Sequence, residues 1–198
     1  MVERVYGDSL DNLADTHFFK PLDMNRTTFY PEKFDLSEIV PTQDTERGFI
    51  HGVVHDESAW VFKTKSNRIM GHAGIFSTVP DILNFMEMLL NDGCVNNKIY
   101  FSKEIVREMY TNQISELNDY NGLGWELHQP RYMGKYASQN TFGKTGFTGC
   151  LCICDISKEI AYVILSNRIY PHRPKDSKTI NQFRASIGEV FLSDGFKV

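Results

Sequence analysis

Hydrophobic and polar positions alternate with a period of two in the C-terminal part of the chain. Residues 150–155 read CLCICD, with the cysteines on one side of the alternation, which is typical of a β-strand with two different faces. A second apolar run, 160–167, is rich in β-branched residues and follows a polar segment of hairpin length. We therefore predict an antiparallel hairpin, preceded by a strand that carries Lys144-Thr145-Gly146.

A period near 3.6 residues marks the predicted helices. Apolar side chains recur at this spacing in four segments: residues 9–19, the residues after Pro80, the residues after Ser102, and residues 177–192. Ser102 is predicted to cap the helix that follows it. The predicted buried stripe of the last helix is Ile180, Phe183, Arg184, Ile187, Val190 and Phe191. Residues 20–70 contain three prolines and few periodic runs, with only a short extended piece expected around Val61. A further strand is predicted over 122–127. These elements indicate an α/β (α+β) fold, in which an antiparallel sheet is flanked by helices.

The composition excludes two classes of partner. The chain has 198 residues, of which 41% are hydrophobic, enough for a packed core. A formal net charge of -4 argues against a nucleic-acid partner, and no apolar run reaches the ~20 residues of a membrane span. The first residues, MVER, do not have the pattern of a signal peptide, so the chain as encoded is expected in the cytoplasm.

The cysteines do not indicate a metal site or a disulfide framework. Cys150, Cys152 and Cys154 would share one strand face, where neighbouring thiols are poorly placed to pair, and their spacing is not that of zinc sites. Cys94 stands alone in a predicted turn. We interpret these thiols as small apolar side chains, and we predict no cofactor and no metal.

The tripeptide Lys144-Thr145-Gly146 offers candidate binding chemistry. Lysine supplies a mobile ammonium and threonine a hydroxyl donor, while glycine lets a ligand approach the backbone closely. An extended ligand can then pair with the exposed edge of such a strand. The tripeptide alone is also compatible with an ordinary surface strand.

Several longer stretches accompany this tripeptide, and together they resemble the serine β-lactamase and penicillin-binding-protein family, in its class C and esterase-like branch. The resemblance covers nearly the whole chain. The matching pieces occur in the order of the family: residues 9–24, VHDE at 54–57, GHAGIFST at 71–78, GLGW at 122–125, GKTGFTG at 143–149, and SNRIYP at 166–171.

The resemblance implies a single, incomplete β-lactamase/transpeptidase-like domain over residues 1–198. Residues 1–120 would be the later part of its helical region, and residues 121–198 its last sheet strands and C-terminal helix. In the family, the residues matching Lys144 and Thr145 bind the substrate carboxylate or support proton transfer, and the backbone N–H matching Phe147 is an oxyanion donor. The implied substrate-binding half-site is Lys144, Thr145, Gly146 and Phe147. Family members are often exported, so the location of an intact parent stays open.

The family's catalytic motifs are incomplete in this chain. They are S-x-x-K, then Y-x-N or S-x-N, then K-T-G, and the chain contains no S-x-x-K. Thr141 and Lys144 have the spacing of T-x-x-K, but strand residues three apart point to opposite faces. We interpret Tyr110-x-Asn112 and Ser138-x-Asn140 as coincidental matches, because both lie shortly before the third motif. No catalytic residue is therefore assigned.

Three functions remain open at this stage. The first is the C-terminal part of a serine hydrolase, acting on a β-lactam, a peptide or an ester in the intact parent and inactive alone. The second is a non-catalytic β-lactamase-like binding or interaction module. The third, ranked last, is a metal-dependent hydrolase built on His51 and His55, although Gly52 and two valines disfavour the required helix. The role of His72 is left open.

The missing opening strands of the family fold would leave one edge of the sheet unpaired. An unpaired edge favours pairing with another copy or another chain. We therefore expect self-association or pairing through this edge, and an acyl-peptide-like or β-lactam ligand in the intact parent.

Overall fold

The computed structural model describes residues 1–196, and these form two compact units. The first, called here the N-terminal unit, contains residues 1–84 and 167–173. The second, called the sheet unit, contains residues 85–166 and continues from residue 174. Each is described by itself. The predicted single domain divided at residue 120 stays a prediction.

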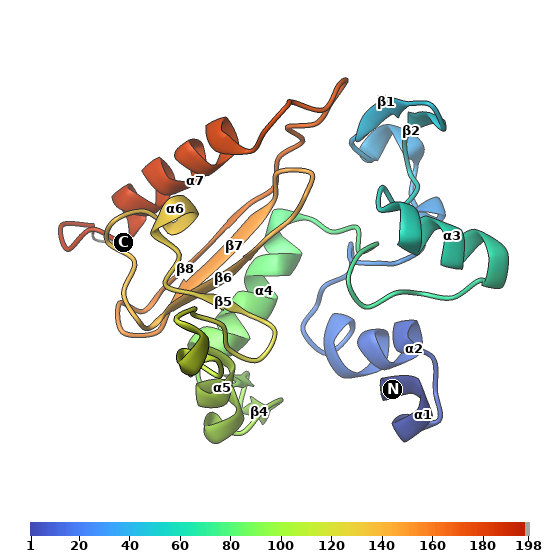
Figure 1. Ribbon diagram of the computed structural model, residues 1–198. Helices are drawn as coiled ribbons and strands as arrows, with labels where there is room; N and C mark the ends of the chain where they lie inside the picture. The colour runs from blue at the N-terminus through green and yellow to red at the C-terminus, as the bar shows by residue number, and fades with distance from the viewer. Residues whose placement is uncertain (197–198) are drawn as a thin grey trace. The chain divides into compact units, whose positions relative to one another are not determined.

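The sheet unit is built on a four-stranded antiparallel sheet (Figure 1). Its strand order is β5-β6-β7-β8, so strands that follow one another in the sequence also pair in the sheet. The pairs predicted from the period-two pattern are present, with Lys144 opposite Cys152 and Cys152 opposite Val163. The bounds are β5 Glu126–Leu127, β6 Thr141–Thr145, β7 Leu151–Asp155 and β8 Ile160–Ile164. The predicted class, an antiparallel sheet flanked by helices, is confirmed.

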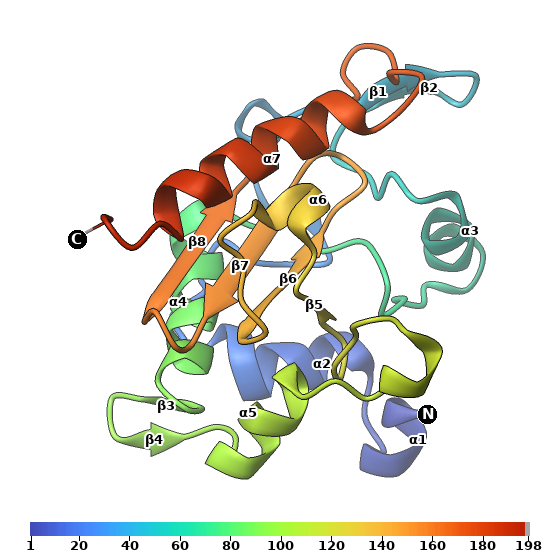
Figure 2. The same cartoon turned by 60° about the vertical axis from the view of Figure 1, so that its left-hand side comes forward.

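Helices cover both faces of this sheet (Figures 1 and 2). Helices α6 (Pro130–Met133) and α7 (Lys178–Phe191) lie on one face, where their side chains pack on alternate residues of β7 and β8. The C-terminal half of α4 (Val79–Leu90) lies on the other face. The core of the α6–α7 face contains Tyr132, Met133, Ala137, Leu151, Ile153, Tyr162 and Leu192.

The packing of α7 on α6 depends on one glycine. A Cβ on Gly188 would lie 2.0 Å from the carbonyl oxygen of Met133, so only glycine allows α7 to approach α6 this closely. The predicted apolar stripe of α7 is partly wrong, because Phe183 and Val190 are exposed. The buried side of the helix instead carries Arg184 together with Gly188.

The remaining elements of the sheet unit are short. The small hairpin β3–β4 precedes α5. Tyr110, at the end of α5, stacks on Phe142 of β6 with ring centroids 5.6 Å apart. Ser102 caps α5 as predicted, accepting from the backbone N–H of Ile105. The bounds are β3 Cys94–Val95, β4 Lys98–Ile99 and α5 Lys103–Tyr110.

The N-terminal unit is mostly helical, with one small hairpin. The predicted helix over 9–19 is present as α2 followed by a π-helical turn, Asp15–Phe19. The N-terminal half of α4 also belongs to this unit. The bounds of the other elements are α1 Val2–Tyr6, α2 Leu10–Ala14, 3-10 turns Pro31–Lys33 and Leu36–Glu38, β1 Gln43–Thr45, β2 Gly48–Ile50 and α3 Glu57–Ser66. Within residues 1–196, no helix has the length and apolar character needed to cross a bilayer.

Helix α3 corrects the extended piece predicted around Val61. The alternation of aromatic residues there suggested a strand, but the ends of the segment carry helix signals. Asp56 caps the N-terminus by accepting from the N–H of Ala59 at 2.9 Å, and Asn67 ends the helix in the left-handed conformation. These capping interactions outweigh the local β propensity.

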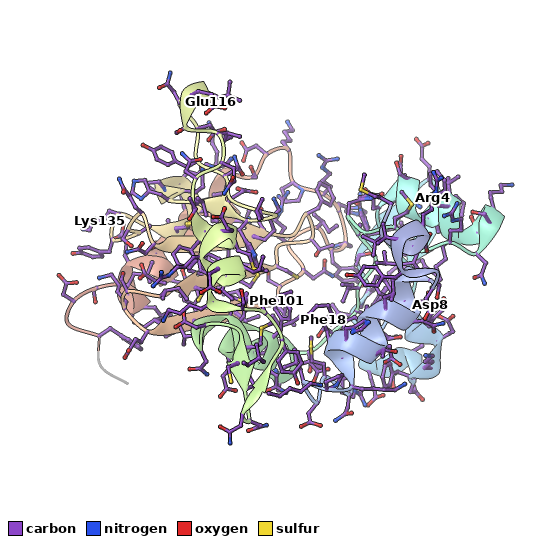
Figure 3. All side chains as sticks on the ribbon, turned by 90° about the horizontal axis from the view of Figure 1, so that it is seen from below. Arg4, Asp8, Phe18, Phe101, Glu116 and Lys135 are labelled. Atoms are coloured by element: carbon purple, nitrogen blue, oxygen red, sulfur yellow. The ribbon has the colours of Figure 1, made fainter. Side chains whose placement is uncertain are left out.

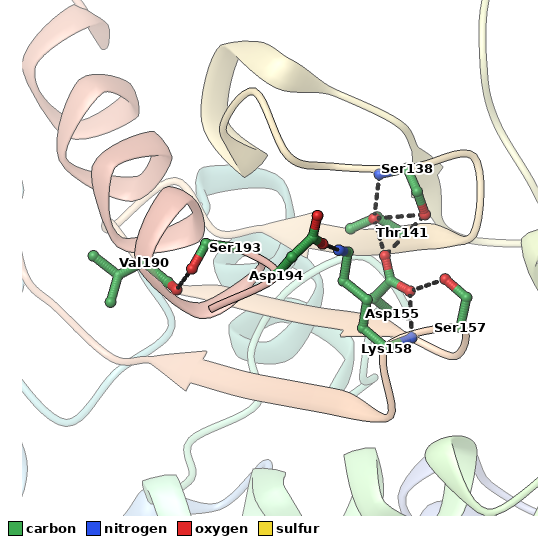
Figure 4. Close-up of polar contacts among 8 residues, drawn as sticks. All are labelled: Ser138, Thr141, Asp155, Ser157, Lys158, Val190, Ser193 and Asp194. Atoms are coloured by element: carbon green, nitrogen blue, oxygen red, sulfur yellow. Dashed lines mark hydrogen bonds and ion pairs between the residues drawn. The ribbon is translucent and has the colours of Figure 1, made fainter. Parts of the chain in front are cut away.

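A buried carboxylate ties the start of β6 to the β7–β8 turn (Figure 4). Asp155 is fully buried. One of its oxygens, Oδ2, accepts from the hydroxyls of Thr141 at 2.5 Å and Ser138 at 2.9 Å. The other, Oδ1, accepts from the Ser157 hydroxyl at 2.6 Å and the Lys158 N–H at 3.0 Å. Four donors compensate the cost of burying the charge.

We predict that Asp155→Ala lowers the free energy of unfolding by about 2–4 kcal/mol, because buried donors lose a charged acceptor. Urea denaturation measures this loss. Asp194→Ala is the matched control: Asp194 is exposed and pairs with Lys158 at 2.8 Å, so its urea midpoint should stay close to that of the wild type. Equal losses in the two variants would contradict the assigned role of Asp155.

Candidate substrate-binding site

The residues Lys144 and Thr145 lie where β6 extends beyond its neighbour β5. In residues 1–196, β5 pairs with β6 at Phe142 and Gly143, and the following His128 N–H donates to the Thr141 carbonyl oxygen, whereas β7 pairs with β6 along its whole length. The N–H of Gly146 donates to Cys150 on the β7 side. Because hydrogen-bonding direction alternates along an antiparallel strand, the backbone N–H and C=O of Thr145 point to the β5 side. The predicted exposed strand edge is therefore present beside Lys144, whose side chain is 53% exposed.

Glycines set the backbone of this strand and its turn. A Cβ on Gly143 would lie 2.4 Å from the carbonyl oxygen of Cys152, so β6 passes too close to β7 for any side chain there. Gly149 has a φ of 121°, which side chains disfavour, and its N–H donates to Gly146 at 3.1 Å. Gly143 thus lets β6 lie close to β7, and Gly149 sets the conformation at the end of the turn 146–149.

Arg184 fixes this turn from α7. Its side chain is buried, and its Nη2 donates to the carbonyl oxygens of Gly146 at 3.1 Å and Cys150 at 2.8 Å. Its Nη1 donates to Asn181 at 3.0 Å. The pattern placed Arg184 in the buried stripe but did not assign it a role. An arginine within an apolar stripe was the available signal, since buried arginines need acceptors.

Lys144 has a carboxylate partner that the sequence did not reveal. The Lys144 Nζ lies 3.3 Å from Oε1 of Glu126 on β5. The second oxygen, Oε2, accepts from the Tyr132 hydroxyl at 2.9 Å and lies 3.4 Å from Nη2 of Arg131. Burial, with the Glu126 charge beside it, raises the pKa of Tyr132 far above its usual value. Tyr132 therefore remains a proton donor to Glu126.

The four predicted half-site residues lie together at this end of β6. Lys144 and Thr145 are on the strand, and Gly146 and Phe147 begin the turn. The Phe147 side chain is about half exposed. The assignment of its N–H as an oxyanion donor stays a prediction.

The partial motif matches have structural partners. Tyr110 stacks on Phe142, and the Asn112 amide donates to the carbonyl oxygen of Asp119 at 2.9 Å. The hydroxyls of Ser138 and Thr141 both donate to Asp155. Tyr110, Asn112, Ser138 and Thr141, which matched parts of the family motifs by spacing, thus make structural contacts.

The histidines of the N-terminal unit bind separate partners. Nε2 of His51 lies 2.6 Å from the carbonyl oxygen of Ile39, and Nδ1 of His55 lies 3.1 Å from Oγ1 of Thr42. Burial, followed by the nearby Arg47 charge, lowers the pKa of His55. Residues 1–196 contain no group of three or more histidine, cysteine, aspartate or glutamate side chains arranged to hold a metal.

His72 is hydrogen-bonded to Asp56 within the N-terminal unit. Its Nε2 lies 3.0 Å from Oδ1 of Asp56, the N-cap of α3, and both side chains are partly exposed. The N–H of Ala59, followed by His72, lowers the pKa of Asp56. The pair thus joins the loop containing His72 to the start of α3.

A family model described as Beta-lactamase matches residues 1–186. Two similar curated proteins come from Salmonella agona (strain SL483), 34% identical over 200 residues, and Escherichia coli O157:H7, 34% identical over 193 residues. Both carry the provisional name D-alanyl-D-alanine carboxypeptidase. The alignments cover 91% and 88% of this chain but 45% and 43% of the relatives. The chain thus spans about half the length of these proteins.

Solved structures show the same fold at lower identity. Simvastatin synthase from Aspergillus terreus has a TM-score of 0.66 at 14% identity, with 95% of this chain and 52% of that chain covered. A β-lactamase from Mycobacterium bovis has a TM-score of 0.60 at 20% identity, with 95% and 57% covered. Both likenesses concern the fold.

We predict that Arg184→Met lowers the free energy of unfolding by about 1.5–3 kcal/mol, because the two carbonyl oxygens lose a charged donor. Urea denaturation measures the loss, and the backbone amide signals of residues 146–149 should shift in NMR spectra. Arg107→Met, at an exposed position of α5, is the control and should change neither. If the amide signals of residues 146–149 did not shift in Arg184→Met, the role of Arg184 in holding this turn would be contradicted.

Proposed function

Because the chain belongs to the β-lactamase family, we propose that it is the C-terminal part of a serine hydrolase that cleaves a β-lactam, a peptide or an ester by acyl transfer. One observation carries this proposal. The strand bearing Lys144 and Thr145 extends past its neighbour and leaves a backbone edge next to the Lys144 ammonium. Such an arrangement suits an extended acyl ligand.

The residues of this edge have distinct roles in the proposal. The Lys144 ammonium attracts a ligand carboxylate or supports proton transfer, and Thr145 supplies a hydroxyl and outward backbone groups. The Phe147 N–H is one oxyanion donor. Removal of one such donor typically costs about 2.7–4 kcal/mol of barrier.

A peptide ending in a free carboxylate is the substrate class that we favour. The two similar curated proteins are named for a carboxypeptidase activity on D-alanyl-D-alanine. A lysine beside an open strand edge fits the two features of such a peptide, its terminal charge and its extended backbone.

Acyl transfer needs a nucleophile, and residues 1–198 contain no S-x-x-K. The S-x-x-K serine attacks the carbonyl, and the lysine one turn later accepts its proton. We therefore propose that the chain binds acyl ligands weakly and does not turn them over by itself.

The alternative is a non-catalytic binding module that retains the recognition edge. The absence of S-x-x-K from residues 1–198 is equally consistent with a fragment of a hydrolase and with a binding module. The encoding DNA distinguishes the two: an in-frame S-x-x-K followed by Y-x-N upstream supports the hydrolase, and their absence supports the module.

We predict that a fluorescent penicillin labels the chain only when the in-frame upstream segment is included. The purified 198-residue chain should stay unlabelled. In the extended protein, Lys144→Ala should slow labelling at least tenfold by removing the cation, as followed by gel fluorescence. Lys135→Ala removes an exposed lysine of the same unit and should leave the rate unchanged. Labelling at a serine within residues 1–198 would refute the proposal.

We also predict association through the outer edge of β8, which has no ladder partner in the described part of the chain. Its pairing with β7 directs the backbone groups of Ala161 and Val163 outward. Sedimentation at micromolar concentration should show a dimer or larger species. Val163→Pro removes an outward N–H without breaking the β7 ladder, and should shift the protein toward monomer. A clean wild-type monomer would contradict this expectation.

A further inference from the structure

Glu126 is built into the sheet at the side of the half-site. It lies opposite Gly143 in the β5–β6 ladder, two residues from the start of the exposed edge. Its side chain is 19% exposed, whereas that of Lys144 is 53% exposed. The carboxylate is thus more sheltered than the ammonium it contacts.

The Tyr132 hydroxyl holds the Glu126 carboxylate from the buried side. Tyr132 is 1% exposed and donates to Oε2 at 2.9 Å. This contact leaves Oε1 directed to Lys144 at 3.3 Å. Because the tyrosine is packed in the core, the carboxylate keeps its place while the longer and more exposed lysine can move.

We propose that Glu126 determines the ligand selectivity of the Lys144 half-site, acting as an internal carboxylate that competes with carboxylate ligands for the Lys144 ammonium. The inference rests on the proposed function, because it assumes that Lys144 meets the ligand. A neutral acyl ligand brings no charge toward Glu126 and does not face this competition.

The charges of Lys144, Arg131 and Glu126 determine how strongly Glu126 opposes a ligand carboxylate. Lys144 and Arg131 carry two positive charges against the one negative charge of Glu126, so the cluster still attracts an anion. A ligand carboxylate on Lys144 would nevertheless lie a few ångströms from the Glu126 carboxylate. Two unit charges about 4 Å apart in water repel enough to change an affinity about fivefold, and the effect grows as solvent screening falls. We therefore expect about tenfold at this partly exposed site.

Binding of N-acetyl-D-alanyl-D-alanine and of its C-terminal amide tests the proposal, by NMR titration of the 198-residue chain. In Glu126→Gln the side-chain oxygen can still accept from Tyr132, while the negative charge is gone. The carboxylate ligand should bind about tenfold more tightly to Glu126→Gln than to the wild type. The amide should bind both proteins equally.

The matched control is Glu116→Gln. Glu116 is exposed on the 3-10 turn Ser115–Leu117, which projects from the sheet unit (Figure 3). Glu116→Gln removes the same charge from the same unit and should leave the affinities for the carboxylate and for the amide unchanged. If Glu126→Gln does not fold, Glu126→Asp withdraws the carboxylate by one methylene and should give a smaller gain in the same direction.

A second readout does not depend on ligand binding. An amine-acylating reagent should modify Lys144 several-fold faster in Glu126→Gln than in the wild type, because the amine has lost its contact with a carboxylate. Mass spectrometry measures the rate, with Lys158, paired with Asp194, as the internal reference.

The outcomes separate the two proposals. An unchanged or weaker affinity for the carboxylate ligand in Glu126→Gln, or an unchanged Lys144 acylation rate, overturns the role of Glu126 alone. If neither ligand binds any variant, the selectivity and the proposed recognition by Lys144 are both overturned.

Discussion

The guanidinium of Arg184 is the interaction on which the binding edge depends. It connects α7 to the two carbonyl oxygens that close the turn after β6. The turn begins with Gly146 and ends with Gly149, and the Gly149 N–H donates to the Gly146 carbonyl oxygen. Flexible residues of this kind need an external contact to hold one conformation. A charged donor in the core supplies that contact, and the surrounding apolar layer shields it from competing water.

The elements predicted from the sequence are those with a strong period. The alternation in residues 150–165 is reproduced by β7 and β8, and the helical spacing after Pro80 and after Ser177 by α4 and α7. These segments each bury one face, so the pattern of side chains records the structure directly. Helix α3 was missed because it is not amphipathic. Its ends are defined by Asp56 and Asn67, and caps are a weaker signal than periodicity.

The candidate site was predicted only in part for a related reason. Lys144, Thr145 and Gly146 are contiguous, so the sequence shows them together. Glu126 contacts Lys144 from 18 residues away along the chain, through strand register, and Arg184 contacts Gly146 from 38 residues away, through helix packing. A single sequence does not record such long-range pairing. The supporting side chains of a binding edge are thus harder to find than its motif.

The reactivity of the cysteines of β7 depends on whether the sheet is paired. Burial raises the pKa of Cys152 to about 11 and that of Cys154 further still. Both side chains therefore remain protonated and unreactive while the strands are paired. Any event that separates β7 from its neighbours uncovers the fully buried Cys154 thiol and restores its nucleophilicity. The rate at which Cys154 is alkylated consequently reports transient opening of the sheet, at a residue that the protein already contains.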